Sequence, residues 1–140
     1  MRKLTILILL LITVTSNAAS LTGDEGMKKN LVGSWKYTPK STVVFYDNGE
    51  FKEYNGDFKV QSVQFGKLPN PKDVSIPLSE GEWYVTGGQL KKLHMKADGQ
   101  TLSMAKRMYQ TCDIKSMSKD EFKCYTILGQ STTTWRRSKQ

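Results

Sequence analysis

Short runs of alternating apolar and polar residues, separated by glycine, asparagine and aspartate, dominate the chain beyond residue 30. Residues 42–46 are β-branched and aromatic, and the polar turn at 47–50 leads into a second such run at 51–54, which predicts a β-hairpin. The same rhythm recurs farther along the chain, at residues 81–86, 89–95, 101–104, 107–116, 122–128 and 131–138. Strand signals at a spacing of about 8 to 12 residues predict an antiparallel barrel or sandwich.

Some segments fit this alternation less well. Leu90 and Leu93 lie three residues apart, so either a bulge falls at residues 91–92 or the strand ends there. Residues 58–65 predict one more strand. Residues 66–79 hold three of the four prolines and predict a long loop, which either covers the mouth of a barrel or is an inert insertion.

The first eighteen residues have the organisation of a cleavable export signal: Arg2 and Lys3, an apolar run at 4–14, and small residues at 16–18. The run is about half the roughly 20 residues that a spanning helix needs, and no cysteine follows it for lipid attachment. We expect a signal peptide at 1–18, an N-terminal segment with a short helix at 19–30, and one domain at 31–140. The expected product is a periplasmic or secreted monomer with no transmembrane segment.

The chain has 21 basic and 13 acidic residues, and its formal charge of +8 falls to +6 without Arg2 and Lys3. The basic residues are scattered in short pairs, which a solvated surface explains better than a polyanion site. No run is dense enough for a nucleic-acid-binding arm, so we expect no nucleic-acid partner.

Cys112 and Cys124 are the only cysteines, and an even count in an exported chain usually means pairing. The residues between them read as a hairpin with a polar turn at 118–121, whose strands bring both sulfurs to the apolar side. We expect a disulfide that staples this hairpin and stabilises the fold by about 2 to 3 kcal/mol. A redox role is disfavoured, because the chain has no Cys-x-x-Cys motif.

Five pieces in order, including Leu-Val-Gly-Ser-Trp-Lys at 31–36 and Trp-Arg-Arg at 135–137, resemble the small bacterial lipocalin-like domain family. The other three lie at 45–51, 81–90 and 114–122. The resemblance implies an all-β, antiparallel meander barrel of about eight strands, with a short N-terminal helix. It also implies that Trp35 of Gly33-Ser34-Trp35, on the first strand, packs under Arg137 of the last, which closes the barrel.

Alternation also predicts which side chains face the interior of such a barrel: Trp35, Val43, Phe45, Trp83, Val85, Met108 and Phe122. Eight-stranded barrels are either filled by their own side chains or hollow enough for one small ligand. We favour a packed core. In a hollow barrel, the same side chains would line the cavity.

Catalysis has little support in the sequence. The single histidine, His94, lies in a lysine-rich segment and is expected at the surface, and the chain has no Gly-x-Ser-x-Gly elbow. We therefore expect no enzyme, no catalytic residue, no metal and no cofactor.

Two functions remain. The resemblance suggests an exported binding protein that carries or senses a small hydrophobic or amphipathic molecule, which needs an apolar cavity of roughly 300 Å³ or more. The alternative is a protein-binding envelope module, such as an inhibitor, immunity factor or accessory protein, with a packed barrel. It would use the loop at 66–79 and the outer face, and it predicts an exposed apolar or aromatic patch.

Overall fold

The computed structural model describes residues 23–55 and 77–138 of the 140-residue chain. In chain order the elements are α1 (Asp24–Leu31), β1 (Gly33–Thr38), β2 (Ser41–Phe45), β3 (Glu50–Asn55), β4 (Ser79–Thr86), β5 (Gln89–Ala97), β6 (Gln100–Thr101), the 3₁₀ helix η1 (Met104–Lys106), β7 (Met108–Met117), β8 (Glu121–Thr126) and β9 (Ser131–Arg137). The predicted signal peptide, the predicted strand at 58–65 and most of the loop at 66–79 lie outside the described residues.

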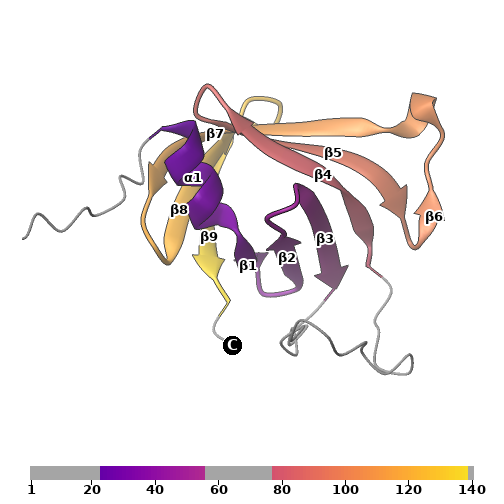
Figure 1. The fold of residues 1–140 in the computed structure, drawn as a ribbon, viewed down its shortest axis with the longest axis horizontal. Coiled ribbons are helices and arrows are strands. Elements are labelled where there is room, and N and C mark those ends of the chain that lie inside the picture. The colour runs from indigo at the N-terminus through magenta and orange to yellow at the C-terminus, as the bar shows by residue number, and fades with distance from the viewer. Residues whose placement is uncertain (1–22, 56–76, 139–140) are drawn as a thin grey trace, which may run out of the picture.

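All strand pairings within the described part are antiparallel, and the strands form a closed ring. Its order is β1-β2-β3-β4-β5-β7-β8-β9, with β9 returning to pair with β1. Figure 1 shows α1 lying against one side of this ring. The predicted all-β meander barrel of about eight strands with a short helix is therefore confirmed.

Strand β5 answers the question raised by Leu90 and Leu93. It continues through residues 91–92 and keeps its alternation there, because Leu90 and Lys92 are buried while the residues beside them are less so. The bulge lies farther along the strand: Glu80 pairs with Lys96 and Gly81 with His94, so Met95 is the extra residue. Gly81 is required there, since a β-carbon would overlap the carbonyl of Leu93. Because side chains alternate between the two faces of a strand, Lys92 lies on the inner face of β5, as Leu90 does.

Two predicted strands are shorter than expected. The strand predicted at 101–104 ends at Thr101, and the chain then turns through η1. Beyond Thr101 one more backbone hydrogen bond reaches β5, from the Leu102 N–H to the Met95 carbonyl at 2.8 Å, and the chain then leaves the sheet. The strand predicted at 122–128 ends at Thr126, because exposed Ile127 and Leu128 belong to the turn into β9.

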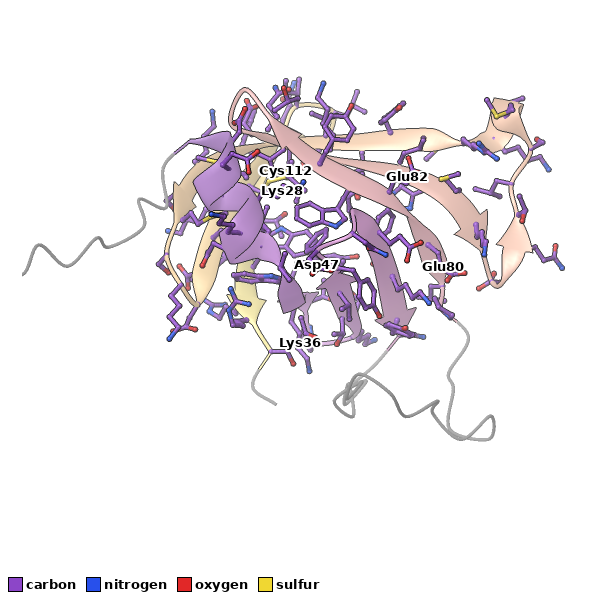
Figure 2. All side chains as sticks on the ribbon, in the orientation of Figure 1. Lys28, Lys36, Asp47, Glu80, Glu82 and Cys112 are labelled. Atoms are coloured by element: carbon purple, nitrogen blue, oxygen red, sulfur yellow. A yellow bond between two sulfur atoms is a disulfide. The ribbon has the colours of Figure 1, made fainter. Side chains whose placement is uncertain are left out.

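The core is an apolar cluster inside the ring, nearest α1, which contributes its last residue, Leu31. Helix α1 is fixed to the barrel by Asp24, whose carboxylate accepts hydrogen bonds from the backbone N–H groups of Gly87 and Gly88, at 2.8 and 2.9 Å. The side chains of the core fill the interior at this end (Figure 2). Its buried members are Leu31, Trp35, Val43, Phe45, Phe51, Trp83, Leu90, Cys112, Phe122, Cys124 and Trp135.

Within the described part of the chain, no helix has both the length and the apolar character needed to cross a membrane.

Candidate functional site

The first and last strands meet at Trp35 and Arg137, which are direct neighbours in the register of β1 and β9. The guanidinium carbon of Arg137 lies 4.2 Å from the centre of the Trp35 ring. A β-carbon on Gly33 would lie 2.7 Å from a guanidinium nitrogen, so glycine makes room for the arginine. The contact predicted between Trp35 and Arg137 is present, and it closes the barrel.

The Arg137 guanidinium also donates hydrogen bonds to three backbone carbonyls. They belong to Asn30 at 2.6 Å, Val32 at 3.1 Å and Lys119 at 2.8 Å. Two of these carbonyls lie at the C-terminal end of α1, where helix carbonyls lack partners within the helix. Arg137 therefore ties the helix, the first strand and the turn between β7 and β8 together, which is a structural role.

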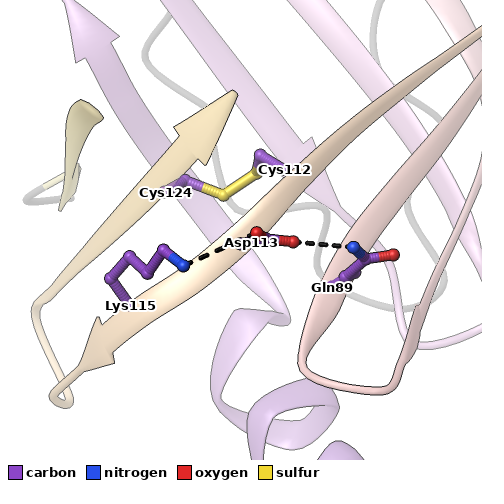
Figure 3. The surroundings of a disulfide bond; sticks show 5 residues. All are labelled: Gln89, Cys112, Asp113, Lys115 and Cys124. Atoms are coloured by element: carbon purple, nitrogen blue, oxygen red, sulfur yellow. Dashed lines mark hydrogen bonds and ion pairs between the residues drawn. A yellow bond between two sulfur atoms is a disulfide. The ribbon is translucent and has the colours of Figure 1, made fainter. Parts of the chain in front are cut away.

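Cys112 and Cys124 form the expected disulfide between β7 and β8, with their α-carbons 5.5 Å apart (Figure 3). Cys124 lies opposite Ile114 in the register, and one extra residue at Lys115 shifts the pairing nearer the turn. The bridge therefore runs diagonally across the hairpin. Such a bond fits a protein that resides in an oxidising compartment.

Most of the side chains predicted to face the interior are in the core. Trp35 packs edge-on against Phe122 at 4.8 Å, and Phe45 lies 5.0 Å from Trp83, measured between ring centres. Val43 is fully buried, and Val85 is partly buried against the same cluster. They pack against one another, and their contacts leave this end of the barrel filled.

The prediction for Met108 was wrong, because its side chain is 68% exposed. Met108 pairs with His94 and so shares the inner face of the sheet, as alternation predicts. The physical reason is length: β5 and β7 extend past the rest of the barrel, as Figure 1 shows, and no strand of the described part lies opposite them there.

Farther from α1 the interior becomes polar. Along β5, Leu90 is followed on the same face by Lys92 and then His94, while Phe51 of β3 is followed by Glu53. Lys92 is only 3% exposed, and its Nζ lies 3.9 Å from Oε2 of Glu53. The other carboxylate oxygen, Oε1, accepts a hydrogen bond of 2.6 Å from the Tyr37 hydroxyl. We call this group of Tyr37, Glu53, Lys92 and His94 the polar compartment.

Burial and charge perturb the ionisable groups of the polar compartment. Burial lowers the pKa of Lys92, and the Glu53 carboxylate opposes that shift. Burial raises the pKa of Tyr37, and its hydrogen bond to Glu53 raises it further. These shifts are the usual consequence of moving charge out of water.

His94 lies in the compartment, so the prediction that it sits on the surface was wrong. It is half-buried, its Nδ1 lies 2.6 Å from the Ser79 hydroxyl, and its ring meets Phe51 edge-on at 5.1 Å. Burial lowers the pKa of His94, and the neighbouring Lys92 charge lowers it further. The prediction took a lysine-rich segment to be solvent-exposed. In the structure Lys92 and His94 share the inner face of β5, so both are buried to some extent.

A partly open cavity of about 60 Å³ adjoins Lys92. It is far smaller than the roughly 300 Å³ that a typical ligand pocket occupies. A larger hollow of about 290 Å³ lies over β3, β4 and β5, but it is open and lined by charged side chains that include Glu80 and Glu82 (Figure 2). The cavity beside Lys92 is lined by Tyr37, Leu90, Lys92, Gln110, Cys112, Cys124, Thr126, Thr133 and Trp135.

Strand β7 has an open edge. Residues 108–113 pair with β5 on one side, but β8 pairs only with residues 113–117 on the other, so within the described residues 108–112 have one unpaired side. Ile114 donates its backbone N–H to Gly88, on the β5 side. Because successive N–H groups of a strand alternate, those of Tyr109 and Thr111 point to the unpaired side.

Apolar and cationic side chains surround this edge. Met104, Met108 and Tyr109 are 77%, 68% and 60% exposed, and Lys106 and Arg107 lie between the two methionines in sequence. These five residues and the unpaired edge at 108–112 form what we call the β7 edge surface. It meets the expectation of an exposed apolar or aromatic patch on a protein-binding module.

A cluster of three or more histidine, cysteine or acidic side chains able to hold a metal ion is absent from the described residues. No protein-family model matches the chain, and no curated protein is similar to it.

Proposed function

We propose that this chain is an exported protein-binding module, in which a packed lipocalin-like barrel serves as a scaffold and the β7 edge surface binds a partner protein. The observation that carries the proposal is the unpaired edge of β7 at residues 108–112, flanked by exposed Met108 and Tyr109. Unpaired strand edges with apolar flanks readily accept an extended segment of another chain, which adds a strand to the sheet.

The interior supports this function over that of a carrier for a hydrophobic molecule. A carrier needs an apolar cavity, yet the described core is filled by aromatic contacts such as Phe45–Trp83. The cavity beside Lys92 holds about 60 Å³, and a cation and several polar groups line it. Burying a hydrophobic ligand against an ammonium group would be unfavourable.

The charge around the edge indicates the chemistry of the partner. Lys106 and Arg107 immediately precede Met108 as a pair, and Lys91 lies beside Thr111 in the register. An extended partner segment that carries acidic and apolar residues complements this surface, because opposite charges speed association and fix the register. The backbone N–H groups of Tyr109 and Thr111 would supply main-chain hydrogen bonds, and Tyr109 would supply aromatic contact.

The experiment uses the backbone donor itself. A photo-reactive amino acid at Tyr109 in cells of the natural host identifies the partner, and its affinity is then measured for two variants at one position. Thr111→Pro removes the N–H group that faces the open edge and leaves the β5 ladder intact, whereas Thr111→Val keeps that N–H group.

The proposal expects Thr111→Pro to lower the affinity for the partner at least tenfold, because this variant loses a main-chain hydrogen bond. Thr111→Val keeps that bond, so its affinity should lie within about twofold of that of the unmodified protein. Equal affinity for all three proteins would refute strand addition at this edge. A bound hydrophobic small molecule in protein purified from the host would instead support the carrier.

A further inference from the structure

The Lys92 side chain is almost completely buried, and the ion pair of its ammonium group with Glu53 is long. Its ion pair with Glu53 spans 3.9 Å, which is longer than a hydrogen bond. The remaining contacts of Nζ are the faces of Phe51 and Trp135, at 5.3 and 5.5 Å from the ring centres. Buried charges are normally both paired and hydrogen-bonded, so this cation has unused donor capacity.

The adjoining cavity offers the complement of a small anion. Besides Lys92, the polar residues that line it are Tyr37, Gln110, Thr126 and Thr133, and no acidic residue lines it. Glu53 is not among the lining residues, and its carboxylate already accepts the hydrogen bond from Tyr37. Gln110, Thr126 and Thr133 each carry a side-chain group that is able to donate a hydrogen bond.

The rest of the lining is apolar: Leu90, the Cys112–Cys124 disulfide and the ring of Trp135. The volume of about 60 Å³ is about twice the roughly 30 Å³ share of one liquid water, which leaves room for a molecule of roughly three or four non-hydrogen atoms. Gln110 is exposed at the rim, so the cavity has an entrance.

We propose that this cavity is a binding site for a short-chain monocarboxylate of the size of acetate. Its carboxylate would accept hydrogen bonds from Lys92, Thr133 and Gln110, and its methyl group would face Leu90 and the disulfide. A phosphate ion has polar oxygens on every side and fits this half-apolar wall poorly. The inference does not rest on the proposed function, although Gln110 and Cys112 of the cavity wall also belong to the β7 edge at residues 108–112.

The test is a titration of ¹⁵N-labelled mature protein with sodium acetate, at constant pH and with sodium chloride replaced to hold the ionic strength. The proposal expects saturable shifts, in the millimolar range, at the backbone amides of Gln110, Cys112 and Thr133. Lys92→Met keeps most of the length of the side chain but removes its charge, and it should lower the affinity for acetate at least tenfold. Lys91→Met, on the opposite face of the same strand, should leave the affinity unchanged.

Thr133→Val provides a second variant, which replaces one lining hydroxyl by a methyl group of the same shape and should weaken acetate severalfold. It keeps the test decisive if Lys92→Met fails to fold. Shifts that grow linearly without saturation overturn the proposal. So does an acetate affinity in Thr133→Val, and in Lys92→Met where it folds, that equals the affinity of the unmodified protein. Because neither variant touches the edge of β7, failure here leaves partner binding to be judged by its own experiment.

Discussion

Lys92 faces Glu53 inside the barrel, with 3.9 Å between the ammonium nitrogen and the nearer carboxylate oxygen. The pair belongs to the polar compartment and lies next to the apolar core. Ion pairs of this kind contribute little net stability when buried, because both charges lose their hydration. Burial also lowers the pKa of Lys92, so the stability of the barrel depends on pH.

The first prediction concerns alkaline pH. The pKa of Lys92 lies below its ordinary value of 10.5, so between the two values the unfolded chain holds a proton that the folded chain has released. The free energy of unfolding of the unmodified protein should therefore rise with pH in this window, relative to Lys92→Met, by up to about 1.4 kcal/mol per pH unit. Urea unfolding at a series of pH values measures the difference.

In the unfolded chain Tyr37 and Tyr54 titrate near pH 10, whereas burial raises the pKa of both in the folded protein. Their effect is to lower stability as pH rises above 10, and it is common to both proteins, so it cancels in the comparison. Parallel curves for the unmodified protein and Lys92→Met would contradict a buried lysine.

The second prediction concerns His94. Its pKa is lowered first by burial and then by the Lys92 charge, so Lys92→Met should raise it toward the ordinary value of 6.5. The ring proton resonances of His94, followed by NMR through the acidic range, report the pKa directly. Lys91→Met serves as the control, because that lysine lies on the other face of β5 and should leave the titration of His94 unaltered.

His94 also affects stability at acidic pH. As pH falls from 6.5 toward the lowered pKa, His94 binds a proton in the unfolded chain but stays neutral in the folded chain. The free energy of unfolding therefore falls. His94→Gln should flatten this part of the curve. A steeper acid dependence in the variant than in the unmodified protein would argue against a half-buried histidine.

The third prediction concerns the closure of the barrel. Arg137→Met removes the three hydrogen bonds to the carbonyls of Asn30, Val32 and Lys119, and should lower the free energy of unfolding by about 3 kcal/mol. Arg136→Met removes a neighbouring arginine whose exposed ion pair with Glu121 should contribute less than about 1 kcal/mol. Similar losses in the two variants would show that Arg137 has no special role in closure.

The fourth prediction concerns the Cys112–Cys124 disulfide. Replacing both cysteines by alanine should lower the free energy of unfolding by about 2 to 3 kcal/mol, because the unfolded chain loses a short closed loop. Urea unfolding of this double variant should be unaffected by reductant, while the unmodified protein should lose the same amount on reduction. The intact mass of the unmodified protein should rise by two protons with reductant, and a constant mass would mean that the cysteines are not bonded.

The sequence predicted the parts of the fold that depend on alternation and turns. The disulfide between Cys112 and Cys124 follows from the even cysteine count and the hairpin between them. The contact between Trp35 and Arg137 was implied by the resemblance to the lipocalin-like family. The strand boundaries at 101–104 were wrong because a strand persists only where a neighbour pairs with it, and the sequence does not show where pairing stops.

The polar compartment could not be predicted, because a lysine in a lysine-rich strand is normally taken as solvent-exposed. Strict alternation from Leu90 does place Lys92 and His94 on the inner face, and that was the available signal. Met108 shows the opposite error: its face was predicted correctly, but its burial depended on whether the barrel extends as far as β7 does.

Native mass spectrometry of the protein purified from its own host, under conditions that preserve complexes, tests the proposed function most directly. If the barrel is packed and β7 binds a partner, the spectrum should show the mass of the polypeptide, either alone or with a partner polypeptide. The Thr111→Pro variant should lose that partner. A retained hydrophobic small molecule, too large for the cavity beside Lys92, would contradict the account.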